Sequence, residues 1–139
     1  MANANKAKGD RAERAVRDLV VDRYPGSFKT RAGFDDDLGD IVLAFGRSRI
    51  VLQVKDVASP LWKKWHEQLA GQVSTCRAAS AGIPVLGGLL VHKRRGIADP
   101  AQWNTVGTLG DVLDLLDAAY LAGRADEAAV AAANESPSR

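Results

Sequence analysis

Apolar side chains repeat every three or four residues in three parts of the chain, which is the spacing of one face of a helix. In residues 10–24 this repeat predicts an amphipathic helix that ends at the Pro-Gly pair following it. Pro60 opens a second helix that runs to about Ser80, because proline suits the first turn of a helix. Residues 110–122 carry a third helical pattern. The chain therefore contains at least three predicted helices.

Shorter apolar runs rich in β-branched residues predict strands between these helices. Residues 41–45 and 49–54 are two such runs, and Gly46-Arg47-Ser48 joins them, which is typical of a β-hairpin. Further short strands are predicted at residues 27–32, 84–92 and 103–108. The run at 84–92 is apolar on both faces, as expected of a buried strand.

The order of helix, three strands, helix and strand predicts an α/β domain with a mixed sheet flanked by helices. The first three strands should form an antiparallel meander, and the second helix should act as a right-handed crossover to a parallel fourth strand. With 139 residues and 46% hydrophobic content, the chain can bury one core. We expect a single domain over residues 1–123 and a flexible tail over residues 124–139.

Composition excludes several classes of protein. No apolar run is long enough to span a bilayer or to serve as a signal-peptide core, so we expect a cytoplasmic protein with no membrane partner, in the host cytoplasm if phage-encoded. A single cysteine, Cys76, permits no internal disulfide and no zinc cluster, and its helical setting predicts a buried structural thiol. Walker, dinucleotide-binding and zinc-protease motifs are absent from the sequence.

Polar residues gather at one end of the predicted hairpin. Asp40 precedes its first strand, and Gln53 and Lys55 close its second, pointing to one face because side chains alternate along a strand. This set suits metal-dependent phosphodiester hydrolysis: Asp40, Gln53 and the Val54 carbonyl would hold the cation, and Lys55 would orient water or neutralise charge. The simpler alternative is that Asp40 is a turn residue after Gly39 and that Lys55 ends a strand in water.

Four short motifs follow one another within residues 8–116. They are Lys8-Gly9-Asp10-Arg11-Ala12-Glu13, Gly39-Asp40-Ile41-Val42, Val51-Leu52-Gln53-Val54-Lys55, and the helix and strand of residues 61–91. Their order and spacing resemble the PD-(D/E)XK nuclease superfamily, and within it the archaeal-type Holliday junction resolvases and their phage-encoded relatives. The resemblance implies a restriction-endonuclease-like core, Mg²⁺ with Mn²⁺ as a substitute, and in-line attack by metal-activated water that leaves a 5′-phosphate.

The resemblance also assigns Glu13 to the metal site, beside Asp40 and Gln53. From the residues alone, Glu13 is a solvated helix charge paired with Arg17. Two positions depart from the family pattern. Gln53 stands where the superfamily usually has an acidic residue, so metal affinity should fall. Gly39 stands where a proline is common.

Other polar residues near the predicted site allow two interpretations. The acidic run at residues 35–37 is either a set of solvated loop charges or the source of a supplementary metal ligand. Gln68 and Gln72 lie one turn apart on the second helix, so one of them is expected to reach the active site or a phosphate. His66 is expected at the surface, because this chemistry needs no histidine base.

Charge is distributed unevenly along the chain. Residues 1–110 contain 17 Lys/Arg against 11 Asp/Glu, whereas residues 111–139 contain 2 against 6. A basic body attracts phosphate backbones, although such a surplus also occurs in proteins that do not bind nucleic acid. Trp62 or Trp65 would stack on an exposed base or wedge into a junction, or face the core instead. The expected DNA contacts are Lys8, Arg11, Arg31, Lys63, Lys64, Gln72, Lys93, Arg94 and Arg95.

The sequence thus predicts a Mg²⁺-dependent structure-specific DNA endonuclease, specifically a Holliday junction resolvase acting as a homodimer on four-way junctions or other branched DNA. One alternative is a nuclease of the same fold that acts on flaps, nicks or DNA ends. Another is a DNA-binding accessory protein whose catalysis is weakened by the change at Gln53.

Overall fold

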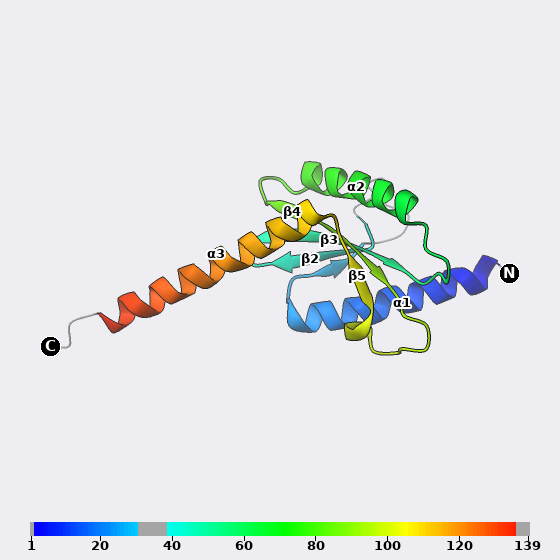
Figure 1. Cartoon of the computed structure of the whole chain (residues 1–139), viewed down its shortest axis with the longest axis horizontal. Coiled ribbons are helices and arrows are strands. Elements are labelled where there is room, and N and C mark those ends of the chain that lie inside the picture. Colours follow the sequence, from blue (N-terminus) through cyan, green and yellow to red (C-terminus); the bar gives the residue numbers. More distant parts are fainter. Residues whose placement is uncertain (1, 31–38, 136–139) are drawn as a thin grey trace.

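A five-stranded mixed sheet with helices on both faces forms the body of the protein, as predicted for an α/β domain (Figure 1). The structure is a computed structural model that describes residues 2–30 and 39–135. In chain order its elements are α1 (Ala2–Arg23), β1 (Phe28–Lys29), β2 (Ile41–Phe45), β3 (Ser48–Lys55), α2 (Trp62–Ala79), β4 (Val85–His92), η1 (Pro100–Gln102), β5 (Asn104–Val106) and α3 (Leu109–Asn134). Within the described residues, no helix combines the length and the apolarity needed to cross a membrane.

The strands lie side by side in the order β1-β2-β3-β4-β5. Strands β1 to β3 form an antiparallel meander and β4 pairs with β3 in parallel, both as predicted. Strand β5 adds an antiparallel edge beside β4. The hairpin turn contains two residues, Gly46 and Arg47, because Ser48 pairs with Phe45 and so belongs to β3. The predicted three-residue connection was one residue too long.

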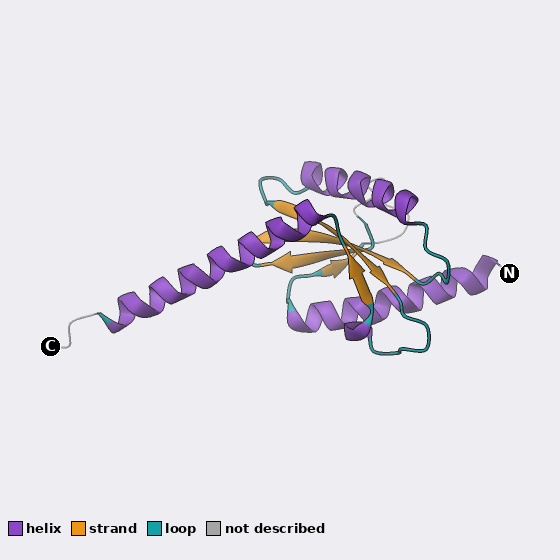
Figure 2. Cartoon of the chain, in the orientation of Figure 1, coloured by secondary structure: helices purple, strands orange, loops and turns teal. Residues whose placement is uncertain are grey.

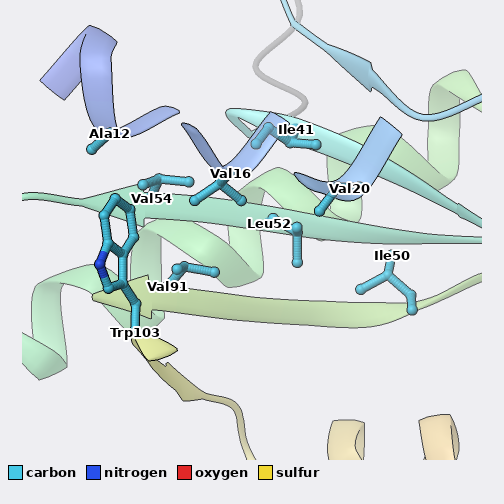
Figure 3. Packing of buried hydrophobic residues seen from close by; sticks show 9 residues of the cluster. All are labelled: Ala12, Val16, Val20, Ile41, Ile50, Leu52, Val54, Val91 and Trp103. Carbon is cyan, nitrogen blue, oxygen red and sulfur yellow. The ribbon is translucent and has the colours of Figure 1, made fainter. Parts of the chain in front are cut away.

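Helices α1 and α2 cover opposite faces of the sheet (Figure 2). The cluster under α1 is made of Ala12, Val16, Val20, Ile41, Ile50, Leu52, Val54, Val91 and Trp103 (Figure 3). The cluster under α2 is made of Val42, Val51, Trp65, Leu69, Val73, Cys76, Val85 and Leu90. Because successive residues of β3 alternate between the two faces, Gln53 and Lys55 lie on the α2 face. The buried position of Cys76 confirms the structural thiol.

Two helices are longer than the apolar pattern predicts. Helix α1 begins at Ala2 instead of residue 10, and α3 continues to Asn134 instead of residue 122. Residues 124–134, expected in a flexible tail, are therefore helical. Alanine is the commonest residue in both extensions and has the highest helix propensity, which does not depend on the apolar periodicity that guided the prediction. By contrast, β1 covers only two of the six residues predicted for the first strand, and residues 31–32 lie outside the described part.

Helix α3 is attached to the body by its first turns alone. The Thr108 side chain caps the helix by accepting from Asp111 N at 3.2 Å, and Asp111 Oδ2 accepts from Gly88 N of β4 at 3.1 Å. Leu115 packs against the α1-side cluster, but no residue of α3 is buried. The rest of the helix extends away from the sheet (Figure 1).

Candidate active site

Asp40 lies where β2 begins, beside the end of β3. Its backbone N donates to Leu52 O at 3.0 Å, and its Oδ2 accepts from Val54 N at 2.6 Å. The carboxylate thus takes the place of a backbone carbonyl at the end of the β2–β3 ladder. This hydrogen bond fixes the Asp40 side chain against the residue between Gln53 and Lys55.

Gln53 and Lys55 share one hydrogen-bond acceptor on α2. Gln53 Nε2 donates to Gln68 Oε1 at 3.1 Å, and Lys55 Nζ donates to the same oxygen at 3.3 Å. Lys55 Nζ also lies 5.7 Å from the ring centre of Trp65, within the range of a cation–π contact. Gln68 therefore reaches the site from α2, and it holds the amide and the ammonium together.

The other end of the Gln53 amide is buried and unpaired. Gln53 is 2% exposed, and its Oε1 has no hydrogen-bond partner in the part of the chain that the structure describes. A buried acceptor without a partner costs about 1–3 kcal/mol, so such groups call for an explanation. A cation is one group that would satisfy this oxygen.

Glu13 lies on the opposite face of the sheet. It projects from α1, and its Oε2 is 3.3 Å from Lys29 Nζ of β1. The expected pair with Arg17 is not formed, because Arg17 contacts the neighbouring Asp18 instead. Glu13 also does not lie on the face of Gln53 and Lys55, where the resemblance would place it. The structure therefore holds Gln53 and Lys55 together on Gln68 and fixes Asp40 against Val54, the residue between them. Glu13 instead pairs with Lys29 on the α1 side of the sheet.

The donor set at this end of the sheet fits a weak site for a hard cation. Among the described residues, no group of three or more His, Cys, Asp or Glu side chains lies together. The oxygen donors available are the Asp40 carboxylate, Gln53 Oε1 and the Val54 carbonyl. Mg²⁺ is commonly held by one or two carboxylates together with substrate phosphates and water, so a single carboxylate is the lower limit. The acidic run at 35–37 lies outside the described residues.

An aromatic cluster lies beside Lys55. Trp65 is 3% exposed, whereas Trp62 is 38% exposed and is the tryptophan available to stack on a base. The His92 ring contacts both, with ring centres 5.6 Å from Trp62 and 5.4 Å from Trp65. His92 Nε2 donates to Val57 O at 2.7 Å and so holds the loop between β3 and α2.

The residues expected to contact DNA separate into four groups. Lys8, Lys93 and Arg95 line one pocket around Asp56, which sequence reasoning did not identify. Arg11, Lys63, Lys64 and Arg94 are exposed. Gln72 is only 5% exposed and lies against Gly39, which does not suit the DNA contact expected for it. Arg31 lies outside the described residues.

Comparison with protein families, characterised proteins and solved structures finds no match to this chain.

Gly39 gives a first testable prediction about the site. Its φ is +86°, and a Cβ there would lie 2.5 Å from Val51 Cγ1 and 3.3 Å from Leu52 O. Proline, common at this position in the resembled family, fixes φ near −65° and cannot adopt this conformation. We expect Gly39→Ala to lower the free energy of unfolding by about 2–4 kcal/mol, with Gly39→Pro at least as damaging.

Gly46 supplies the matched control for this prediction. Its φ is +57°, but no atom lies within 4 Å of the position that a Cβ would take, so Gly46→Ala tests backbone strain without a clash. Denaturant unfolding should show a smaller loss for Gly46→Ala, about 1 kcal/mol. Equal losses at the two positions would mean that the contact with Val51 is unimportant.

Proposed function

We propose that this protein is a metal-dependent, structure-specific DNA endonuclease with a restriction-endonuclease-like core, and specifically a Holliday junction resolvase. The observation that carries the proposal is the placement of three polar groups at the end of β3. The Asp40 carboxylate is fixed by the backbone N of Val54, the residue between Gln53 and Lys55; the buried Gln53 Oε1 has no partner among the described residues; and the Lys55 ammonium is held by Gln68. A carboxylate and an amide oxygen suit a hard cation, and an ammonium suits a phosphate that gains charge.

In this proposal the residues of the site either hold the metal or stabilise charge. Asp40, Gln53 and the Val54 carbonyl would hold Mg²⁺ or Mn²⁺, which when bound activates water and polarises the phosphate. The Lys55 ammonium stabilises negative charge on the phosphate, and the Gln68 oxygen keeps it in place. Gln68 also fixes the Gln53 amide with its nitrogen toward α2, which leaves the oxygen for the cation.

A second candidate function is DNA binding with weakened catalysis. The position of Glu13 favours this alternative, because its carboxylate pairs with Lys29 on the other face of the sheet. The metal would then depend on Asp40 as its one carboxylate among the described residues. A nuclease of the same fold that acts on flaps, nicks or ends remains the enzyme alternative.

A substrate panel tests the proposal. Labelled four-way junction, flap and linear duplex are incubated with the protein and Mg²⁺ or Mn²⁺, with EDTA as the blank. We expect paired symmetric cuts in the junction that leave 5′-phosphates and depend on the metal. Preferred cutting of the flap or the duplex end would support the other nuclease, and tight junction binding without any cut would support the accessory protein.

Because the Gln53 side chain is uncharged, replacing it with a carboxylate should change the metal dependence of cleavage. Gln53→Glu should lower the Mg²⁺ concentration for half-maximal cleavage on the order of tenfold, because a charged oxygen binds a hard cation better than an amide. Cleavage rates are measured against Mg²⁺ concentration, with Gln53→Leu as the control that lacks any oxygen. An unchanged midpoint for Gln53→Glu would exclude position 53 from the metal site.

Resolution of a junction requires two opposed cuts, so the proposal includes a two-fold homodimer. Apolar residues of β4 and of the Trp103 segment are buried within the chain and cannot form its interface: Leu90 of β4 is 0% exposed and Trp103 is 7% exposed. Helix α3 instead exposes apolar side chains four and three residues apart along one stripe. The stripe consists of Leu109, Leu113, Leu116 and Tyr120. We assign the dimer contact to this stripe.

A further inference from the structure

A pocket of about 360 Å³ lies at the ends of β3 and β4, on the α1 side of the sheet. Its lining is contributed by α1, by the loop after β3 and by the loop after β4. Lys93 N donates to Lys55 O at 2.9 Å, which fixes the start of the loop after β4 against the end of β3. The residues that line the pocket are Lys8, Asp56, Val57, Ala58, Lys93, Arg95 and Gly96.

Asp56 is the centre of this pocket. Its side chain is 10% exposed, and its two oxygens lie 3.5 Å from Lys8 Nζ and 3.7 Å from Lys93 Nζ. Charge-assisted hydrogen bonds measure about 2.7–2.9 Å, so these ion pairs are held by charge at a longer distance. Asp56 Oδ2 accordingly has no hydrogen bond within the described ranges 2–30 and 39–135. The carboxylate therefore holds the two ammonium groups at the pocket by charge.

The lining retains an excess of positive charge. Three cations and one carboxylate line the pocket, and the side chains of Lys8 and Lys93 are 47% and 33% exposed. Lys93 Nζ also lies 5.5 Å from the ring centre of Trp103, whose Nε1 donates to Ile97 O at 2.7 Å. Lys93 is thus held between a carboxylate and an aromatic ring. A preorganised, partly exposed excess of positive charge is suited to an anion such as phosphate.

The pocket and the candidate active site lie at the same end of β3 on opposite faces. Lys55 belongs to the α2 face, and Asp56, the next residue, turns to the α1 face. A nucleic-acid strand that crosses this end of the sheet passes both. We propose that the pocket binds a phosphate group of that strand, and that Asp56 is a positioning residue that converges Lys8 and Lys93 on it. This inference rests on the proposed action on DNA for its ligand.

Asp56→Asn separates a positioning role from a simple charge effect. Removing a negative charge beside a phosphate should raise DNA affinity if Asp56 only repels the ligand. If Asp56 instead holds the lysines, the substitution should weaken binding at least about fivefold. It should also reduce the salt slope, which is the slope of the logarithm of the binding constant against the logarithm of the salt concentration, by about 1, the value of one lost phosphate contact. Junction binding is measured at several salt concentrations in EDTA, so cleavage does not enter. Asp18→Asn, which removes an exposed α1 carboxylate paired with Arg17, is the matched control.

Arg95→Ala provides a second variant that does not depend on Asp56, because Arg95 is an exposed residue of the pocket lining. We expect the same reduction of the salt slope. Unchanged or tighter binding by Asp56→Asn, with Arg95→Ala also unchanged, would overturn the inference. Junctions with and without terminal 5′-phosphates distinguish the source of the ligand: equal affinities identify a backbone phosphate, and a preference for the phosphorylated form identifies a strand end.

Inorganic phosphate tests the pocket without DNA. In NMR spectra of the full chain, the Trp103 indole N–H signal should shift saturably with added phosphate, because Lys93 contacts that ring, while sodium chloride at equal ionic strength should not shift it. Arg95→Ala should abolish this shift. If the pocket binds phosphate but the protein cuts no DNA, the nuclease proposal alone is refuted. If the protein cuts DNA but phosphate does not shift the Trp103 signal and Asp56→Asn does not change the affinity for the junction, the pocket proposal alone is refuted.

Discussion

Asp40→Asn and Lys55→Ala should each lower the rate of junction cleavage at least about a hundredfold, the scale of removing one electrostatic stabiliser from a reacting phosphate. Asparagine keeps an oxygen that can accept from Val54 N, so the end of the β2–β3 ladder should remain intact while the charge is lost. Lys55→Ala removes an ammonium that is held by Gln68 and is not part of the core. Junction binding should therefore survive both changes.

Single-turnover cleavage and metal-free junction binding measure the two effects separately. Asp18→Asn and Lys6→Ala are the matched controls, because both residues are exposed on α1. Thermal unfolding of each variant shows whether the fold is kept. A parallel loss of cleavage, binding and stability would show that Asp40 and Lys55 serve only the end of the sheet.

Leu116→Asp should convert the proposed dimer to a monomer. Leu116 is 60% exposed in the middle of the α3 stripe. In the dimer both copies lose a buried leucine, at about 1.5–3 kcal/mol each, and gain a carboxylate at an apolar contact. Together these effects exceed about 4 kcal/mol, or a thousandfold in dimer affinity. Light scattering at micromolar concentration should show twice the 14.8 kDa chain mass for the wild type and the single mass for the variant.

Leu121→Asp is the control for this change. Leu121 is 63% exposed on the same helix, but it lies one residue beyond Tyr120 and therefore points away from the stripe. A supercoiled plasmid with a cruciform should be linearised by the wild type and Leu121→Asp, and only nicked by Leu116→Asp. A wild-type monomer, or equal effects of the two substitutions, would refute the assignment of the dimer contact to the stripe.

Local sequence patterns predicted the sheet and one part of the site. Alternation along β3 placed Gln53 and Lys55 on a common face, and the hairpin placed Asp40 beside them, because neighbouring strands fix both relations. The parallel β3–β4 pair followed from the helix between them. These relations depend on segments that are close in the sequence, so one sequence is enough to predict them.

The contacts of α1 side chains with the sheet could not be predicted in the same way. The contact of Glu13 with Lys29 depends on how α1 is rotated and where it crosses the sheet, which apolar spacing does not specify. The pocket around Asp56 was missed because the predicted helix began after Lys8, so Lys8 had no defined position. The extension of α3 was missed because helix propensity, without an apolar stripe, determines its second half.

The Gln53 oxygen, which has no partner among the described residues, is a point of local frustration at the end of β3. Its cost of about 1–3 kcal/mol is a sizeable share of the 5–15 kcal/mol by which domains are typically stable. An apolar side chain of similar size would remove that cost but would also remove the acceptor. In the proposed metal site, selection for a stable fold and selection for a bound cation therefore act on position 53 in opposite directions.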